Sequence, residues 1–199
     1  MKTIEINLYE FNELSQQAKD KVRNWIYLGL DYLNDDIQKS FDAFCDLFDV
    51  NWRSIDYQEP YRNEYKINVP EYAEDLKGVR LATYLYNNYL KNLYKGKFFS
   101  TNGYYIDGKY HYKFKYSNWY KEISCPFSGC CYDEFLLDAI IKFCDKPNDN
   151  DTFESLIDEC IMDLCKAVQA EIEYRLTDEA IKEDCEANQY FFTESGEIA

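Results

Sequence analysis

DTFESLIDECIMDLCKAVQAEIEYRL, residues Asp151 to Leu176, is the most regularly patterned part of this sequence. Its apolar residues recur at intervals of three and four, which places them on one side of an α-helix. They are Phe153, Leu156, Ile157, Cys160, Ile161, Leu164, Cys165, Val168 and Ile172. Asp151 followed by Glu154 is typical of an N-cap and its capping-box partner. The sequence therefore predicts one long helix over residues 151–176, with its apolar side in a core.

Acidic residues gather on the other side of this helix and just after it. Of the formal net charge of −15, the 19 acidic and five basic residues of 133–199 contribute −14. Thr177 is a candidate N-cap for a last helix over 178–187, whose first turn is acidic. The candidate partner-binding carboxylates are Asp158, Glu159, Asp163, Glu171, Glu173, Asp178, Glu179, Glu183 and Asp184. Such carboxylates can imitate phosphate charges and occupy the cationic groove of a nucleic-acid-binding protein, whereas the simpler interpretation is an acidic, solubilising surface.

Outside this region, strand and helix patterns alternate irregularly. Helical spacing is found over 15–30, 35–48, 76–93 and 134–143, and extended segments are indicated over 3–9, 50–70 and 189–193. We find no internal repeat and no linker long enough to divide the chain. The pattern predicts one α+β domain spanning residues 1–199, with a small antiparallel sheet packed against several helices.

The middle of the chain is basic and rich in tyrosine. Residues 77–121 contain nine basic residues and one acid, and Asp107-Gly108 is typical of a two-residue hairpin turn. Tyrosines alternate with lysines through 104–116, so we expect one aromatic face and one basic face, and a third strand over 119–123. This ribbon has the composition of a stacking platform for single-stranded nucleic acid, unless the tyrosines pack on the helices and the lysines face solvent. The residues of this alternative site are Lys109, Lys113, Lys115, Tyr110 and Tyr112.

Motifs that carry catalysis or hold a cofactor are absent from the sequence. It contains one histidine, His111, and no nucleophile elbow, phosphate-binding loop or dinucleotide fingerprint. We therefore expect a protein that is not an enzyme and uses no cofactor. Eight cysteines without a signal peptide indicate free thiols in a reducing compartment. Cys125, Cys130 and Cys131 lack the spacing of a zinc knuckle, so they either pack inward from a loop or bind metal with a distant ligand.

The two ends of the chain resemble a family of small uncharacterised phage and prophage proteins. At the N-terminus the matching residues are Tyr9 to Ser15 (YEFNELS), Ala18-Lys19 and Lys21 to Trp25 (KVRNW). At the C-terminus they are Ala170 to Tyr174 (AEIEY), Asp178 to Ala180 (DEA) and Glu186 to Gly196 (EANQYFFTESG). The matches cover about a quarter of the chain, and the middle, including the tyrosine–lysine ribbon, departs from the family.

The resemblance implies an accessory protein of a mobile element that acts in the cytoplasm of the bacterial host. Proteins of that kind are often stoichiometric inhibitors of host defence, and anti-CRISPR and anti-restriction proteins are frequently small and acidic. The expected partner is thus a basic defence protein of the CRISPR-effector kind, bound through the acidic residues named above. A nucleic-acid-binding regulator acting through the tyrosine–lysine ribbon is the alternative, and homodimerisation stays open.

Overall fold

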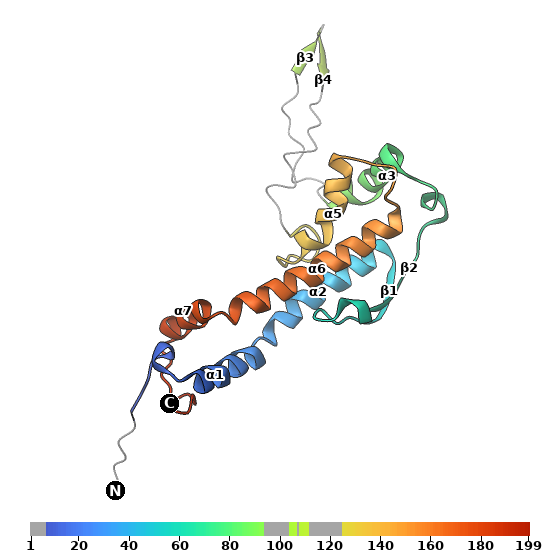
Figure 1. Ribbon diagram of the computed structural model, residues 1–199. Helices are drawn as coiled ribbons and strands as arrows, with labels where there is room; N and C mark the ends of the chain where they lie inside the picture. The colour runs from blue at the N-terminus through green and yellow to red at the C-terminus, as the bar shows by residue number, and fades with distance from the viewer. Residues whose placement is uncertain (1–6, 94–103, 107, 112–124) are drawn as a thin grey trace. The chain divides into compact units, whose positions relative to one another are not determined.

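The computed structural model describes residues 7–93, 104–106, 108–111 and 125–199 (Figure 1). Within these residues the chain is mostly helical, with two separate two-stranded antiparallel sheets, so the predicted α+β class is confirmed. Its contacts cluster into two compact units. We call residues 1–35 and 168–199 the terminal unit, and residues 36–167 the central unit. That residues 1–199 form a single domain stays a prediction.

The central unit contains most of the helices and both sheets. Its elements, in chain order, are α2 (Tyr32–Phe48, from Asp36 onward), β1 (Val50–Ser54), β2 (Glu64–Ile67), α3 (Gly78–Leu85), the π-helical turn η4 (Tyr86–Leu90), α4 (Lys91–Leu93), β3 (Tyr104–Ile106), β4 (Lys109–His111), α5 (Asp133–Asp145) and α6 (Phe153–Arg175, up to Ala167). The single helix predicted over 76–93 therefore passes through a π-helical turn. The extended segments predicted within 50–70 are β1 and β2, which are separated by the short 3-10 helix Pro60–Arg62.

The apolar stripe of α6 is buried from Phe153 to Val168 as the periodicity predicts, whereas its last member, Ile172, is half-buried. The eight apolar residues from Phe153 to Val168 are 2% exposed or less. Burial of each leucine, isoleucine, valine or phenylalanine side chain contributes about 1.5–3 kcal/mol to the free energy of unfolding. The stripe is therefore a major source of stability.

The cap of α6 differs from the prediction, which placed it at Asp151 and Glu154. The backbone N–H of Thr152 donates to Ser155 Oγ at 2.9 Å, and the Ser155 N–H donates to Thr152 Oγ1 at 3.1 Å. These reciprocal bonds form the capping box of a helix that begins at Phe153, one residue later than the sequence pattern indicates. Asp151 instead accepts a hydrogen bond from the Asn148 side chain at 2.6 Å.

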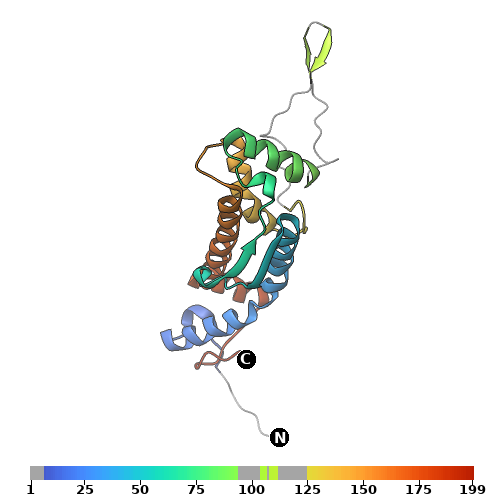
Figure 2. The ribbon, with the colours of Figure 1, turned by 90° about the vertical axis from the view of Figure 1, so that its right-hand side faces the viewer.

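The β1–β2 sheet lies beside α2 and α6 in the central unit (Figure 2). The two strands run antiparallel, with Val50 opposite Ile67 and a register shift between Trp52 and Ser54. The Trp52 ring meets the ring of Phe41 on α2 edge-on at 5.5 Å. Aromatic rings also join α2 to the π-helical turn, where Phe48 stacks on Tyr89 at 4.6 Å. Such ring pairs add about 0.5–1.5 kcal/mol beyond the area they bury.

The terminal unit is built from α1 (Gln16–Gly29), α7 (Asp178–Asn188) and the 3-10 helix η1 (Phe11–Glu13). Both predicted caps are confirmed, because Ser15 accepts a hydrogen bond from the Ala18 N–H and Thr177 from the Ala180 N–H, each at 3.3 Å. One apolar cluster joins these elements to the C-terminal tail. Its buried members are Phe11, Leu14, Ala18, Val22, Ile181, Cys185 and Phe192.

The two ends of the described chain pair in the terminal unit. The Tyr9 and Phe192 backbones exchange two hydrogen bonds of 2.9 Å, and Phe192 also pairs with Ile198. These are isolated antiparallel bridges, so the strand predicted over 189–193 is reduced to this pairing. Of the strand predicted over 3–9, residues 3–6 lie outside the described residues.

The predicted hairpin around Asp107-Gly108 is present as β3 and β4. Tyr104 pairs with His111, Tyr105 with Tyr110 and Ile106 with Lys109. The side chains of these strands lie outside what the structure describes, so the expected aromatic and basic faces stay a prediction.

Candidate functional site

The predicted carboxylates of the central unit are partly engaged within the fold. The Tyr65 hydroxyl donates to Asp158 Oδ1 at 3.0 Å, and burial together with this hydrogen bond raises the pKa of Tyr65. Asp163 forms an ion pair of 2.8 Å with Lys166, and its carboxylate raises the pKa of that lysine. Glu159 is exposed and makes no hydrogen bond or ion pair with the residues described. Within this unit, the partner-binding hypothesis is thus best supported at Glu159.

Two more predicted carboxylates form ion pairs in the terminal unit. Glu171 accepts from Arg175 Nε at 2.6 Å, one helical turn along α6. Asp178 lies between two cations of α1, forming an ion pair with Arg23 and another, of 3.2 Å, with Lys19. The hydrogen bond from Arg23, followed by that from Lys19, holds the pKa of Asp178 below its ordinary value. These two acids contribute to internal contacts of the terminal unit.

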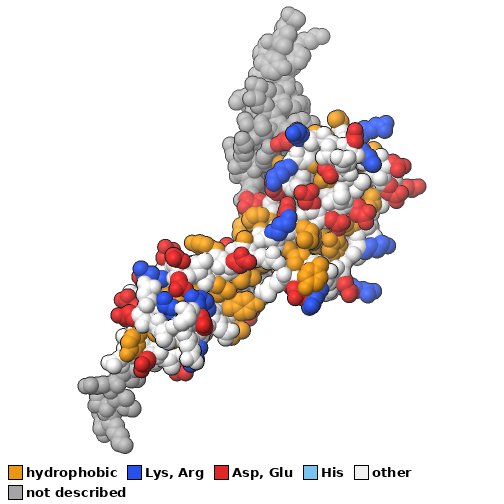
Figure 3. Space-filling view, in the orientation of Figure 1, with side chains coloured by type: hydrophobic (Ala, Val, Ile, Leu, Met, Phe, Trp, Pro, Cys, Tyr) orange, Lys and Arg blue, Asp and Glu red, His pale blue; other side chains and the backbone are white. Residues whose placement is uncertain are grey.

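The remaining four predicted carboxylates are exposed on the terminal unit. They are Glu173 near the end of α6, and Glu179, Glu183 and Asp184 on α7. Among the residues that the structure describes, none of the four forms an ion pair, and Asp184 accepts only from Asn188, its neighbour one turn along, at 3.1 Å. Figure 3 shows acidic side chains over the α7 part of this unit, with a few lysine and arginine side chains among them.

The sequence of α7 explains why these acids point outward. Ile181 and Cys185, four residues apart, are buried in the apolar cluster, so that side of the helix faces the core. Glu179 and Glu183, also four residues apart, are exposed on another side of the helix. The Cβ atoms of residues at this spacing lie about 5–6 Å apart. Like charges at this spacing destabilise a helix by a few tenths of a kcal/mol. This repulsion opposes the favourable interaction of Glu179, in the first turn of α7, with the helix dipole.

The acidity is concentrated in the terminal unit. Its 67 residues contain 15 acidic and six basic residues, which gives −9, whereas the 132 residues of the central unit contain 22 acidic and 16 basic residues, which gives −6. Four of the six bases, Lys19, Arg23, Arg175 and Lys182, form ion pairs with acids of the same unit. The remaining acids, which include those on the exposed side of α7, carry the net negative charge.

The alternative nucleic-acid-binding site is described only in part. Lys109 and Tyr110 lie in β4, where Lys109 pairs with Ile106 and Tyr110 with Tyr105. Lys113, Lys115 and Tyr112 lie outside the described residues. The hairpin of the nucleic-acid hypothesis is therefore present, and its role in binding stays a prediction.

A buried carboxylate, which the sequence pattern did not single out, organises the cysteine-containing loop. Asp133, at the start of α5, is fully buried. It accepts hydrogen bonds from the backbone N–H groups of Phe127 at 3.0 Å and Ser128 at 2.8 Å, and from the Ser40 hydroxyl of α2 at 2.8 Å. A buried charge requires such partners, and here they fix the loop against α2 and α5.

The cysteines of that loop do not form a metal site with other described residues. Cys130 Sγ lies 3.3 Å from Asp36 Oδ1, and Cys131 is exposed. No group of three or more histidine, cysteine or acidic side chains among the described residues has the arrangement of a metal site. Burial raises the pKa of Cys165 and of Cys185 to about 11, and that of Cys45 to about 12. These thiols are protonated at neutral pH and are poor nucleophiles.

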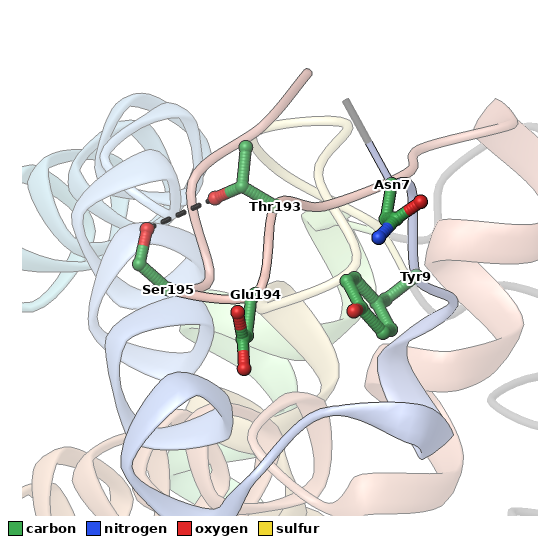
Figure 4. A pocket seen from close by; sticks show the side chains of 5 residues that line it. All are labelled: Asn7, Tyr9, Thr193, Glu194 and Ser195. Carbon is green, nitrogen blue, oxygen red and sulfur yellow. Dashed lines mark hydrogen bonds between the residues drawn. The ribbon is translucent and has the colours of Figure 1, made fainter. Parts of the chain in front are cut away.

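An open pocket of about 500 Å³ lies in the terminal unit (Figure 4). Sequence analysis did not identify it, because it joins residues from the two ends of the chain. Its lining residues are Asn7, Tyr9, Thr193, Glu194 and Ser195. The hydroxyl groups of Thr193 and Ser195 are hydrogen-bonded at 2.9 Å.

No family model, no curated protein and no solved structure matches this chain. Within the described residues, we find no helix with the length and hydropathy needed to cross a membrane.

Proposed function

We propose that this chain is a phage-encoded inhibitor that binds the cationic, nucleic-acid-binding surface of a bacterial defence protein in the host cytoplasm. A CRISPR effector is the expected class of target, which follows from the family resemblance of the chain ends. The observation that carries the proposal is the set of exposed carboxylates Glu173, Glu179, Glu183 and Asp184 on the terminal unit. We define these four residues as the acidic surface.

The charge distribution supports binding through this surface. A unit of 67 residues with a net charge of −9 attracts a cationic partner over roughly the Debye length, about 8–10 Å at physiological salt. The carboxylates that the fold uses, such as Asp178 and Glu171, are separate from those it leaves exposed. The acidic surface can thus bind a partner without breaking the internal ion pairs.

The mechanism is occlusion rather than chemistry. Lysine and arginine side chains that contact phosphates in a nucleic-acid groove would contact carboxylates of α7 and the end of α6 instead. Glu179 and Glu183 are held by the helix at a fixed spacing, so they present two charges without loss of backbone freedom on binding. The chain would act with a fixed stoichiometry and leave its target unmodified.

A plaque assay tests the proposal in cells. Host strains that each carry one CRISPR or restriction system are infected with a phage that the system blocks, with and without expression of this chain. We expect plaque formation to return for one system with the wild-type chain. We expect no return with the variant Glu179→Gln, Glu183→Gln, Asp184→Asn at the same protein level. The proposal would be contradicted if that variant restored plaques equally well, or if the wild-type chain restored plaques against none of the systems.

A further inference from the structure

The pocket at the Thr193–Ser195 turn presents an anion, an aromatic ring and neutral hydrogen-bond acceptors to one opening. Tyr9 and Phe192 form an isolated antiparallel bridge, and the other lining residues lie within three residues of it. Figure 4 shows the Tyr9 ring and the Glu194 side chain on opposite sides of the opening, with Asn7 beside Tyr9.

The carboxylate of this pocket has no partner in the described part of the chain. Glu194 is exposed and forms no hydrogen bond or ion pair with the residues described, and all five lining residues lack a positive charge. Ser195 Oγ shares one hydrogen bond with Thr193 and keeps lone-pair capacity. The single formal charge of the lining is therefore negative.

The turn that carries Glu194 is held in place by its own backbone. The Thr193 N–H donates to the Glu197 carbonyl at 2.8 Å, and the Gly196 N–H donates to the Thr193 carbonyl at 2.9 Å. Gly196 has a φ of +81°, and a Cβ there would lie 2.6 Å from the Ala18 carbonyl oxygen of α1. On the other side of the opening, Tyr9 packs against the apolar cluster of the unit. The pocket is consequently preorganised.

We propose that this pocket binds an arginine side chain of the partner protein. A planar guanidinium group stacks on the ring of Tyr9 while its N–H groups donate to the Glu194 carboxylate. The space of about 500 Å³ exceeds one guanidinium group, so it also admits neighbouring residues of the partner segment. This inference rests on the proposed function for its partner, because a cationic nucleic-acid-binding surface is where exposed arginines are found.

The test uses the full-length chain and two short peptides, with amide NMR spectra as the readout. The probes are acetyl-Gly-Arg-Gly-amide and the same peptide with citrulline, which has nearly the same shape and no charge. We expect the arginine peptide to shift the amide signals of Tyr9 and of residues 193–197. We expect the citrulline peptide to bind about tenfold more weakly, since it loses a charge-assisted hydrogen bond. Glu194→Gln should weaken binding of the arginine peptide by a similar factor.

Glu197→Gln is the matched control, because Glu197 belongs to the same turn, is exposed and does not line the pocket. It should leave peptide binding unchanged. Equal binding of the two peptides, unaltered binding by Glu194→Gln, or shifts confined to α7 would overturn the pocket proposal. Because no defence protein is present, this outcome is independent of the plaque assay. A failed plaque assay with peptide binding intact would refute the inhibitor function and leave the arginine pocket.

Discussion

Asp178 forms an ion pair with Arg23 that joins the first turn of α7 to the middle of α1. Lys19, one helical turn before Arg23, lies 3.2 Å from the other oxygen of the same carboxylate. The next residue, Glu179, is exposed and pairs with no described cation. Two adjacent acids of one helix thus have different roles, one inside the fold and one on its surface. This difference separates the carboxylates that stabilise the terminal unit from those proposed to bind a partner.

Asp178→Asn is expected to destabilise the protein by about 1 kcal/mol at pH 7, the upper range for a partly exposed ion pair. The pKa of Asp178 is lowered in the folded state, so its stabilising contribution is present above the ordinary aspartate pKa, near 4. It is lost as the pH falls through the lowered value. Urea unfolding of both proteins at pH 7, 5 and 3 should show a difference at pH 7 and 5 that shrinks at pH 3.

Glu183→Gln removes the same charge from the exposed side of α7 and serves as the control for Asp178→Asn. We expect its free energy of unfolding to lie within about 0.5 kcal/mol of the wild type at each pH. If the difference between wild type and Asp178→Asn grows toward pH 3, the pKa of Asp178 is not lowered in the folded state.

Asp133→Ala is expected to cost about 3 kcal/mol of unfolding free energy. The substitution removes the acceptor that the N–H groups of half-buried Phe127 and Ser128 share with the buried Ser40 hydroxyl. Asp138→Ala, on the same helix, breaks only a partly exposed ion pair with Lys142 and should cost less than about 1 kcal/mol. Chemical denaturation of the two variants side by side checks this, and equal losses would be inconsistent with the role given to Asp133.

Thr152→Ala should destabilise α6 by about 1 kcal/mol, because it removes the side-chain oxygen that accepts the Ser155 N–H. Glu154→Ala, at the position that the sequence pattern indicated for the capping box, should change the free energy of unfolding by less than about 0.5 kcal/mol. Thermal unfolding of both variants measures the difference. A larger loss for Glu154→Ala would restore the cap to Asp151 and Glu154.

Gly196→Ala should destabilise the protein by about 1–3 kcal/mol, since the residue has a φ of +81° and an added Cβ would meet the Ala18 carbonyl. Gly29→Ala is the matched substitution, because Gly29 ends α1 and a Cβ there meets no atom within 4 Å. It should be neutral or stabilising by up to about 1 kcal/mol. Differential scanning calorimetry of the two variants gives both values, and similar melting temperatures would argue against the close approach of the tail to α1.

The helices could be predicted well because their evidence is local. The spacing of Phe153 to Val168 and the hydroxyl caps Ser15 and Thr177 are properties of short segments, and each is confirmed. The start of α6 differs by one residue because Asp151 and Thr152 are adjacent residues that can both cap a helix, and the structure uses Thr152.

The division of the acids could not be predicted, because ion pairs join residues far apart in the sequence. Nothing near Asp178 in the chain indicates that Lys19 and Arg23 will meet it, 159 and 155 residues away. The same holds for Ser40 and Asp133, which are 93 residues apart, and for the pocket formed by Tyr9 and Glu194. Sequence patterns identify the charge, whereas the fold determines which charges remain exposed.

The most direct test of the central claim is a competition titration between this chain and DNA for the defence protein that the plaque assay identifies. Labelled target DNA is bound to that defence protein, and the chain is added in increasing amounts. The account predicts that the wild type displaces the DNA, as does Asp158→Asn, Asp163→Asn, Glu171→Gln, in which three internally engaged acids lose their charge. Glu179→Gln, Glu183→Gln, Asp184→Asn should fail to displace it. Equal displacement by both triple variants, or binding of the chain to the DNA itself, would contradict the claim that the exposed acids of α7 contact the target.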